Sequence, residues 1–228
     1  MISPLLPTGM TEDETLDDLR ARLAPLIAAN AGFDGWSDKA VAMAAAQANV
    51  DADIAALAFK DGAMQMIAAW FATIDTAMLN ALTPEALAAM KIRAKITALA
   101  ETRLTLLAPH REALRRAQAV LAMPQHLVAA TKLGWHAADI MWRAAGDTAV
   151  DYNHYTKRAT LGGVYAATLL TFVNDESEGF ADTRAFLARR IEGIMRFEKA
   201  KARLTAQSDM HFSPARFLGR LRYRVNHR

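Results

Sequence analysis

Apolar residues recur at helical spacing along almost the whole chain, and this periodicity is the strongest constraint on its fold. The first clear stripe contains Leu16, Leu19, Leu23, Leu26 and Ile27. Only 11 glycines and 7 prolines interrupt the 228 residues, and no segment makes a convincing strand. The pattern therefore predicts an all-α fold, a bundle of about ten helices.

Capping residues, glycine and proline predict where the helices begin and end. Segment 33–37 (FDGWS) ends the first helix, and Ser37 is positioned to cap the second. Segment 83–85 (TPE) starts a helix with proline in its first turn, and we expect that helix to continue to Ala108. Asp151 is positioned to cap a later, strongly apolar helix.

Residues 16–59 have the outline of the DNA-binding part of TetR-type regulators. A long helix is followed by a break, a short helix, a tight turn and a second short helix, which would enter the major groove. Phosphate contacts need arginine and lysine. The second short helix, residues 51–59 (DADIAALAF), carries two acids and no base. We expect a vestigial helix-turn-helix that does not bind nucleic acid.

The charge of the chain is unevenly distributed. Residues 1–60 carry nine acids and four bases, whereas residues 184–228 carry three acids and twelve bases. A basic C-terminal end predicts contact with an anionic surface. The chain has no cysteine, which excludes disulfides and thiolate metal sites.

The last segment, residues 214–228, predicts a basic amphipathic helix. Leucine and phenylalanine fall on one face at helical spacing, and arginines occupy the rest, which is typical of a membrane-surface element. The alternative is a terminal helix that packs on the body of the protein. The candidate membrane-binding residues are Arg216, Phe217, Leu218, Arg220, Leu221 and Arg224.

The N-terminus and the longest uncharged run bear on localisation. Residues 1–10 (MISPLLPTGM) lack the basic start of a secretory signal, and acids follow directly. The uncharged run 159–174 is shorter than the roughly 20 residues that span a bilayer. We expect a bacterial cytoplasmic protein that associates peripherally with the inner membrane.

No motif for catalysis or cofactor binding is present. The six histidines lack metal-ligand spacing, apart from His136 and Asp139 one helical turn apart, which are too few for a site. Gly162 and Gly163 indicate close helix packing rather than a phosphate loop. The sequence predicts no cofactor, no metal site and a protein that is not an enzyme.

Residues 152–158 (YNHYTKR) form an aromatic and basic cluster. Three of its first four positions carry rings, and neighbours on a helix point about 100° apart, so at least one ring should be exposed. Such rings are either ordinary core and rim residues or an interaction surface. The candidate partner-binding residues are Trp142, Tyr152, Asn153, His154, Tyr155, Lys157 and Arg158.

Segments 146–147 (GD), 151–158 (DYNHYTKR) and 182–191 (DTRAFLARRI), together with Trp142, resemble the Coq-nine accessory proteins of ubiquinone biosynthesis. The resemblance implies a TetR-like helical homodimer that holds an isoprenoid or phospholipid in an apolar pocket. It also implies docking on a membrane through the C-terminal helix and presentation of a quinone intermediate to the demethoxyubiquinone hydroxylase. The family's Asn-Trp-Tyr partner segment maps onto Asn153, His154 and Tyr155, with His154 in place of the usual tryptophan.

Three regions follow from these predictions. Residues 13–60 form the helix-turn-helix-like subdomain, residues 61–206 the lipid-binding and dimerisation domain, and residues 207–228 a tether with the basic helix. We predict the pocket wall on the two most apolar helices, although core packing is the alternative for each residue. The candidates are Ile67, Trp70, Phe71, Ile74, Leu161, Tyr165, Leu169 and Phe172. The other function considered is a TetR-type transcriptional regulator with a small-molecule pocket.

Overall fold

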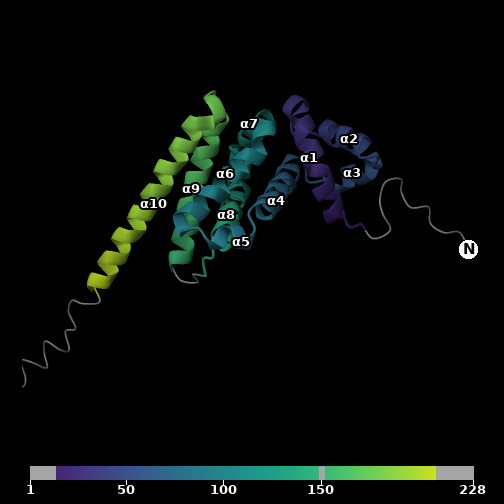
Figure 1. The fold of residues 1–228 in the computed structure, drawn as a ribbon. Helices are drawn as coiled ribbons and strands as arrows, with labels where there is room; N and C mark the ends of the chain where they lie inside the picture. Colours follow the sequence, from purple (N-terminus) through teal and green to yellow (C-terminus); the bar gives the residue numbers. More distant parts are fainter. Residues whose placement is uncertain (1–13, 149–151, 209–228) are drawn as a thin grey trace, which may run out of the picture.

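The computed structural model describes residues 14–148 and 152–208, and within these ranges it contains helices and no strand (Figure 1). This confirms the predicted all-α fold class. The helices are α1 (Leu16–Asp34), α2 (Asp38–Gln47), α3 (Ala52–Ala58), α4 (Ala63–Ala81), α5 (Pro84–Ala88), α6 (Ile92–Leu107), α7 (Arg111–Leu121), α8 (Leu127–Ala144), α9 (Tyr152–Phe172) and α10 (Ala181–Ser208). Short 3-10 turns precede α7, α8 and α10.

Local capping chemistry explains the first helix ends. The Thr15 hydroxyl accepts a hydrogen bond from the Asp18 backbone N–H at 3.2 Å, and the Asp18 carboxylate accepts one from the Thr15 N–H at 3.1 Å. Gly35 ends α1 at a φ of +72°, which an L side chain rarely adopts. Ser37 occupies the predicted N-cap position of α2, but its hydroxyl donates to the Asp34 carbonyl instead of capping.

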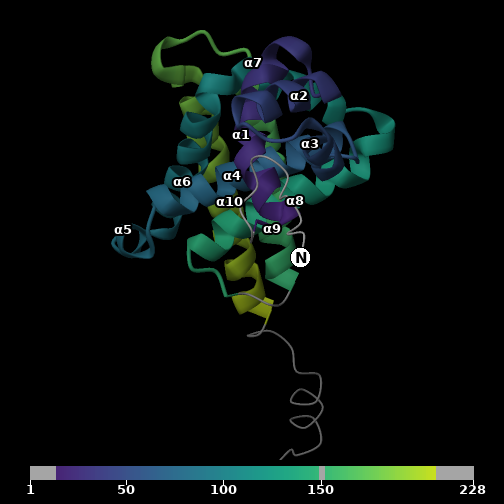
Figure 2. The same ribbon diagram turned by 90° about the vertical axis from the view of Figure 1, so that its right-hand side faces the viewer.

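The predicted single helix from residue 84 to Ala108 is wrong, because the chain turns between α5 and α6. No glycine or proline marks this turn. Leu87 and Ile96 are both buried, yet nine positions along one continuous helix would place them about 180° apart. The turn lets both side chains reach the core, and Figure 2 shows α5 standing out to the side of α6.

One continuous hydrophobic core runs from α1 to α10. Helix α1 packs against α2, α4 and α7, while α10 lies along α9 and α6 at the opposite end of the molecule (Figure 1). The Trp36 indole N–H donates to the Ala113 carbonyl at 3.0 Å and joins the first helices to α7. The predicted domain boundary between residues 60 and 61 stays a prediction, since residues on both sides of it belong to this one core.

Helices α2 and α3 pack together in a helix-turn-helix arrangement. Asn49, with a φ of +53°, makes the turn between them, and Asp51 caps α3 by accepting from the Asp53 and Ile54 N–H groups. The exposed side of α3 carries Asp51, Asp53 and Leu57, with no basic residue within the helix.

Helices α8 and α9 approach each other closely at glycine. A Cβ added at Gly162 would lie 3.3 Å from the Gly134 carbonyl oxygen, whereas one at Gly163 would meet nothing within 4 Å. The predicted close packing is therefore confirmed for Gly162 and wrong for Gly163. None of the helices in the described ranges is long and apolar enough to cross a membrane.

Candidate functional site

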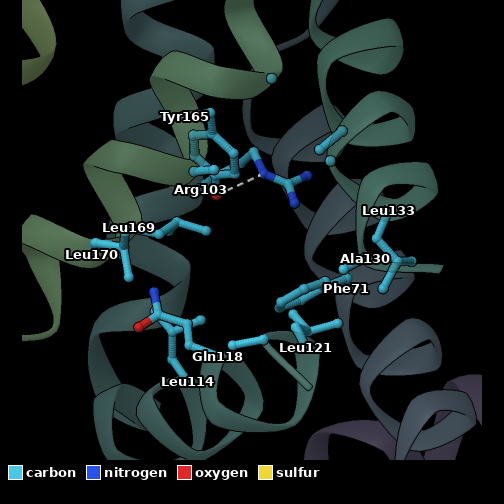
Figure 3. Close-up of a pocket in the computed structure, with 15 residues that line it drawn as sticks. Phe71, Arg103, Leu114, Gln118, Leu121, Ala130, Leu133, Tyr165, Leu169 and Leu170 are labelled. Atoms are coloured by element: carbon cyan, nitrogen blue, oxygen red, sulfur yellow. Dashed lines mark hydrogen bonds between the residues drawn. The ribbon is translucent and has the colours of Figure 1, made fainter. Parts of the chain in front are cut away.

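A cavity of about 250 Å³ lies among α4, α6, α7, α8 and α9 (Figure 3). Its wall is almost entirely apolar, and only Arg103, Gln118 and Tyr165 bring polar atoms to it. The remaining lining residues are Phe71, Leu114, Leu121, Ala122, Ala130, Leu133, Gly134, Ala137, Gly162, Ala166, Leu169 and Leu170. Such a space suits an apolar ligand with a small polar group.

The cavity includes three of the eight predicted pocket residues, namely Phe71, Tyr165 and Leu169. The other five are buried in the core and do not line it: Ile67, Trp70, Ile74, Leu161 and Phe172. The residues that α7 and α8 contribute were missed. Their helical stripes are visible in the sequence, but periodicity does not distinguish a residue at a cavity from one in a filled core.

The polar end of the cavity is built on Arg103, which is 2% exposed. Its guanidinium forms an ion pair with the buried Asp75 of α4, and its Nε donates to the Tyr165 hydroxyl at 3.0 Å. The guanidinium carbon also lies 5.2 Å from the centre of the Tyr165 ring. His136 also lies near this pair, with its Nε2 4.0 Å from the Asp75 carboxylate. Sequence reasoning did not identify Asp75 or Arg103, because their pairing joins separate helices.

A second candidate surface consists of three rings on α8 and α9, which we call the aromatic patch: Trp135, His154 and Tyr155. The Tyr155 ring centre lies 6.0 Å from that of Trp135 and 5.1 Å from that of His154. Tyr155 is 61% exposed, and the other two rings are partly buried. The prediction that at least one ring of this segment is exposed is confirmed.

Trp142 and Arg158, predicted to contact a partner, are instead buried. Arg158 donates to Asp139 at 2.5 Å, to Asp147 at 3.0 Å and to the His154 carbonyl at 3.2 Å. The placement of these two residues on an exposed surface is wrong, because their polar groups are used inside the α8–α9 pair. We call Arg158 with its two aspartates the Arg158 cluster.

Lys157 also belongs to this corner of the molecule. Its ammonium donates to Asp147 at 2.7 Å and lies 5.3 Å from the centre of the Trp142 ring. The Trp142 indole N–H in turn donates to the Lys157 carbonyl at 3.1 Å. Asn153 is partly buried, whereas the Tyr152 side chain is not among those that the structure describes. The six candidate membrane-binding residues, between positions 216 and 224, also lie outside the described residues.

The carboxylates of the Arg158 cluster are held in their charged form. Burial alone would raise the pKa of Asp139 and of Asp147, but the hydrogen bonds and charges of their cationic neighbours outweigh it. The net effect is a pKa below the ordinary value for both groups. The pKa of Arg158 is raised, because its bonds to these aspartates outweigh the penalty of burial. The cluster therefore fixes the start of α9 against α8.

The turn between α9 and α10 is organised around Asp175. Its carboxylate accepts from the backbone N–H and the hydroxyl of both Ser177 and Thr183, at 2.5 to 2.9 Å. Burial would raise the pKa of Asp175, but these four bonds outweigh it and lower the pKa well below the usual range. Arg111 adds a bond to the Asp175 carbonyl at 2.7 Å. The Asp175 carboxylate is satisfied within the chain, whereas the buried Nε of Arg111 makes no hydrogen bond to the described residues.

No group of three histidine, aspartate or glutamate side chains that could hold a metal ion occurs within residues 14–148 and 152–208. His136 and Asp139, the pair noted in the sequence, take separate partners. His136 faces Asp75, whereas Asp139 binds Arg158 and Arg143. The described residues offer binding through apolar contact, through the polar side chains of Arg103, Gln118 and Tyr165, and through the aromatic patch.

Comparisons with known proteins agree with this architecture. Residues 127–198, from α8 through much of α10, match the family model COQ9. The ubiquinone biosynthesis protein COQ9, mitochondrial, of Rattus norvegicus is 32% identical over 169 residues, covering 71% of this chain and 54% of that protein. The Homo sapiens protein of the same name is 30% identical over 168 residues, covering 71% and 52%. The chain thus spans about half the length of these curated relatives.

Among solved structures, the chain is similar to a TetR transcriptional regulator from Nitrosomonas europaea ATCC 19718. The TM-score is 0.61 at 22% identity, and the match covers 76% of this chain and 96% of the regulator. This likeness shows the TetR-like fold. The match to the family model over residues 127–198 and the identity to the curated relatives show that the chain is similar to the COQ9 family.

Proposed function

We propose that this chain is a lipid-binding accessory protein of ubiquinone biosynthesis. It holds part of a polyprenyl quinone intermediate at a membrane and presents that intermediate to a demethoxyubiquinone hydroxylase. It acts by binding and not by catalysis. The observation that carries the proposal is the apolar cavity among α4, α6, α7, α8 and α9, whose wall on α8 and α9 lies within the residues that match the COQ9 family model.

The physical need for such a protein follows from the substrate. A polyprenyl tail is held in the bilayer by about 0.8 kcal/mol for each buried CH₂ group. A protein can draw the molecule toward a soluble catalytic site only if its own surface offers comparable burial. The wall formed by residues such as Phe71, Leu133 and Leu169 supports this role.

The lipids that accompany the purified protein test this proposal. We expect organic extraction and mass spectrometry to recover isoprenoids, quinones or phospholipids in amounts comparable to the protein. The same preparation should not bind duplex DNA tightly, because α3 carries no basic residue. Lipid-free protein that binds DNA would favour the transcriptional-regulator alternative instead.

The aromatic patch supports a protein partner, since exposed tyrosine and tryptophan are enriched at binding hot spots. A His154→Trp change would enlarge the apolar contact beside Tyr155 and should tighten binding to the hydroxylase, measured by surface plasmon resonance. A Glu178→Gln change, at an exposed position in the α9–α10 turn, is the control. Unchanged or weaker binding by the His154 variant would show that the partner docks elsewhere.

The C-terminal residues 214–228 are proposed as the membrane anchor of a homodimer, on the basis of their five arginines and apolar stripe. Deleting them should abolish sedimentation with anionic liposomes, since each arginine near such a surface contributes about 1 kcal/mol. Circular dichroism should show that the fold is retained. Sedimentation equal to that of the full chain would rule out this anchor.

A further inference from the structure

We propose that the Arg103–Tyr165 end of the cavity binds a neutral, oxygen-bearing head group, such as a quinone carbonyl, while the tail leaves through the mouth beside Leu170. This inference rests on the proposed lipid-binding function and adds the orientation and chemical class of the ligand. Figure 3 shows Arg103 and Tyr165 together on one side of the cavity, with Leu170 and Gln118 elsewhere on its wall.

The two polar residues at this end present hydrogen-bond donors to the cavity. The Tyr165 hydroxyl accepts from Arg103 Nε, which leaves its own hydrogen available to donate. Arg103 Nη1 pairs with Asp75, and no hydrogen bond joins Nη2 to the described residues. A ligand oxygen that accepts from the Tyr165 hydroxyl and from the Arg103 guanidinium would gain hydrogen bonds in an apolar surrounding, where they are strongest.

The charge at this end favours a neutral ligand over an anion. Asp75 is buried beside Arg103 and offsets the charge of the guanidinium. A carboxylate or phosphate would therefore lose its hydration without gaining a net opposite charge, which is unfavourable in an apolar site. A carbonyl oxygen gains the same hydrogen bonds at a much smaller desolvation cost.

The size of the cavity sets how much of the ligand it encloses. Its volume of about 250 Å³ lies below the roughly 300–1,000 Å³ of pockets that enclose a drug-sized ligand. It can hold a ring and the start of a tail, but not a whole polyprenyl chain. The rest of the tail must continue outside.

Exposed apolar residues provide a path for that tail. Leu170, at the mouth of the cavity, is 58% exposed. Leu127 is 54% exposed and lies three positions before Ala130, so it is on the face of α8 that borders the cavity. The tail can therefore remain in contact with apolar side chains, or with a bilayer, while the ring is enclosed.

Two probes separate recognition of the head group from recognition of the tail. One is a short-chain ubiquinone with two isoprene units, and the other is the same prenyl chain on an oxygen-free benzene ring. Calorimetry on the full chain should give Tyr165→Phe about fivefold weaker binding of the quinone, the value of one neutral hydrogen bond. Binding of the oxygen-free probe should be unchanged.

Further variants and a fatty acid probe serve as controls. Thr105→Val, which removes an exposed hydroxyl of α6 outside the cavity wall, should leave quinone binding unchanged. Leu169→Trp fills the cavity and should weaken both probes, and Ala166→Trp serves the same purpose if the first variant does not fold. A fatty acid probe of matched length should bind more weakly than the quinone.

Three outcomes would overturn this inference alone. They are equal quinone binding by Tyr165→Phe and the wild type, an equal loss of quinone binding in Thr105→Val, and preference for the fatty acid. If instead neither probe is affected by filling the cavity, the ligand does not bind there. In that case the proposed function loses the observation that carries it.

Discussion

Arg103 and Arg158 are both buried and both paired with aspartate, but their surroundings differ. Arg158 is 1% exposed, and its Nε and Nη1 donate to Asp139, Asp147 and the His154 carbonyl. Arg103 has one aspartate and one phenol as partners and borders the cavity. The first arginine joins two helices through two carboxylates, whereas the second has one carboxylate partner and lines a cavity that a ligand can fill.

The contrast teaches that burial of a charge does not by itself indicate function. A buried cation held between two carboxylates indicates a structural role. A buried cation that lines an apolar cavity is a candidate for ligand binding. Four experiments test this distinction, in order of decreasing expected effect on stability.

The largest effect is expected for Arg158→Leu. Removing the guanidinium leaves the Asp139 and Asp147 carboxylates with less compensation inside the protein, which typically costs about 3–5 kcal/mol. Urea unfolding followed by circular dichroism measures this loss. Arg196→Ala, which removes an exposed pair with Glu192, is the control and should change little. A loss as small as that of the control would mean that the cluster does not hold α9 in place.

The Arg158 cluster should also make the stability of the protein sensitive to acid. The pKa values of Asp139 and Asp147 are lowered in the folded chain, so both groups bind more protons when unfolded. Their contribution is present above about pH 4, the ordinary aspartate value, and is lost as the pH falls toward the folded values. Asp175 acts in the same direction. Unfolding free energies measured from pH 6 downward should therefore decrease, and less steeply in Arg158→Leu. Parallel curves would indicate that other carboxylates control acid unfolding.

Tyr165→Phe should have a smaller effect on stability than either of these changes. It removes the acceptor of the Arg103 Nε bond and leaves the ion pair with Asp75 intact, a loss of about 1 kcal/mol. Thermal unfolding without and with the short-chain quinone measures the change. The ligand should stabilise the variant less than the wild type. Equal stabilisation by the ligand would remove Tyr165 from the binding site.

The smallest effect is expected when both partners of the cavity pair are replaced. Asp75→Leu with Arg103→Met should leave stability within about 1 kcal/mol of the wild type or raise it, since apolar residues can replace a buried ion pair. Arg103→Met alone should be clearly destabilising, because Asp75 then loses its partner. The double variant should fold and lose its preference for the quinone over the oxygen-free probe. Severe destabilisation of the double variant would show that this pair, like the Arg158 cluster, is structural.

Much of the fold could be predicted from local chemistry. The capping box at Thr15, the cap at Asp51 and the helix end at Gly35 follow from residue types that satisfy backbone groups within a few positions. The break between α5 and α6 could not be predicted in this way. It depends on two residues, Leu87 and Ile96, that must both reach the same core.

The candidate site was only partly predictable, for a similar reason. The apolar stripe of α9 correctly placed Tyr165 and Leu169 on an inward face, but it also included Leu161 and Phe172, which are fully packed. Whether an inward residue meets a neighbour or an empty space depends on how helices far apart in the sequence pack.

The sequence by itself determined the helices, the lack of basic residues on α3 and the resemblance that led to the COQ9 family, because propensity, charge and motif are properties of neighbouring residues. Only the tertiary structure decided that Arg158 is internal, that Arg103 pairs with Asp75 and that a cavity remains among α4, α6, α7, α8 and α9. The physical reason is that burial and ion pairing arise between separate helices. An arginine therefore joins two helices at position 158 and forms the candidate polar end of a binding site at position 103.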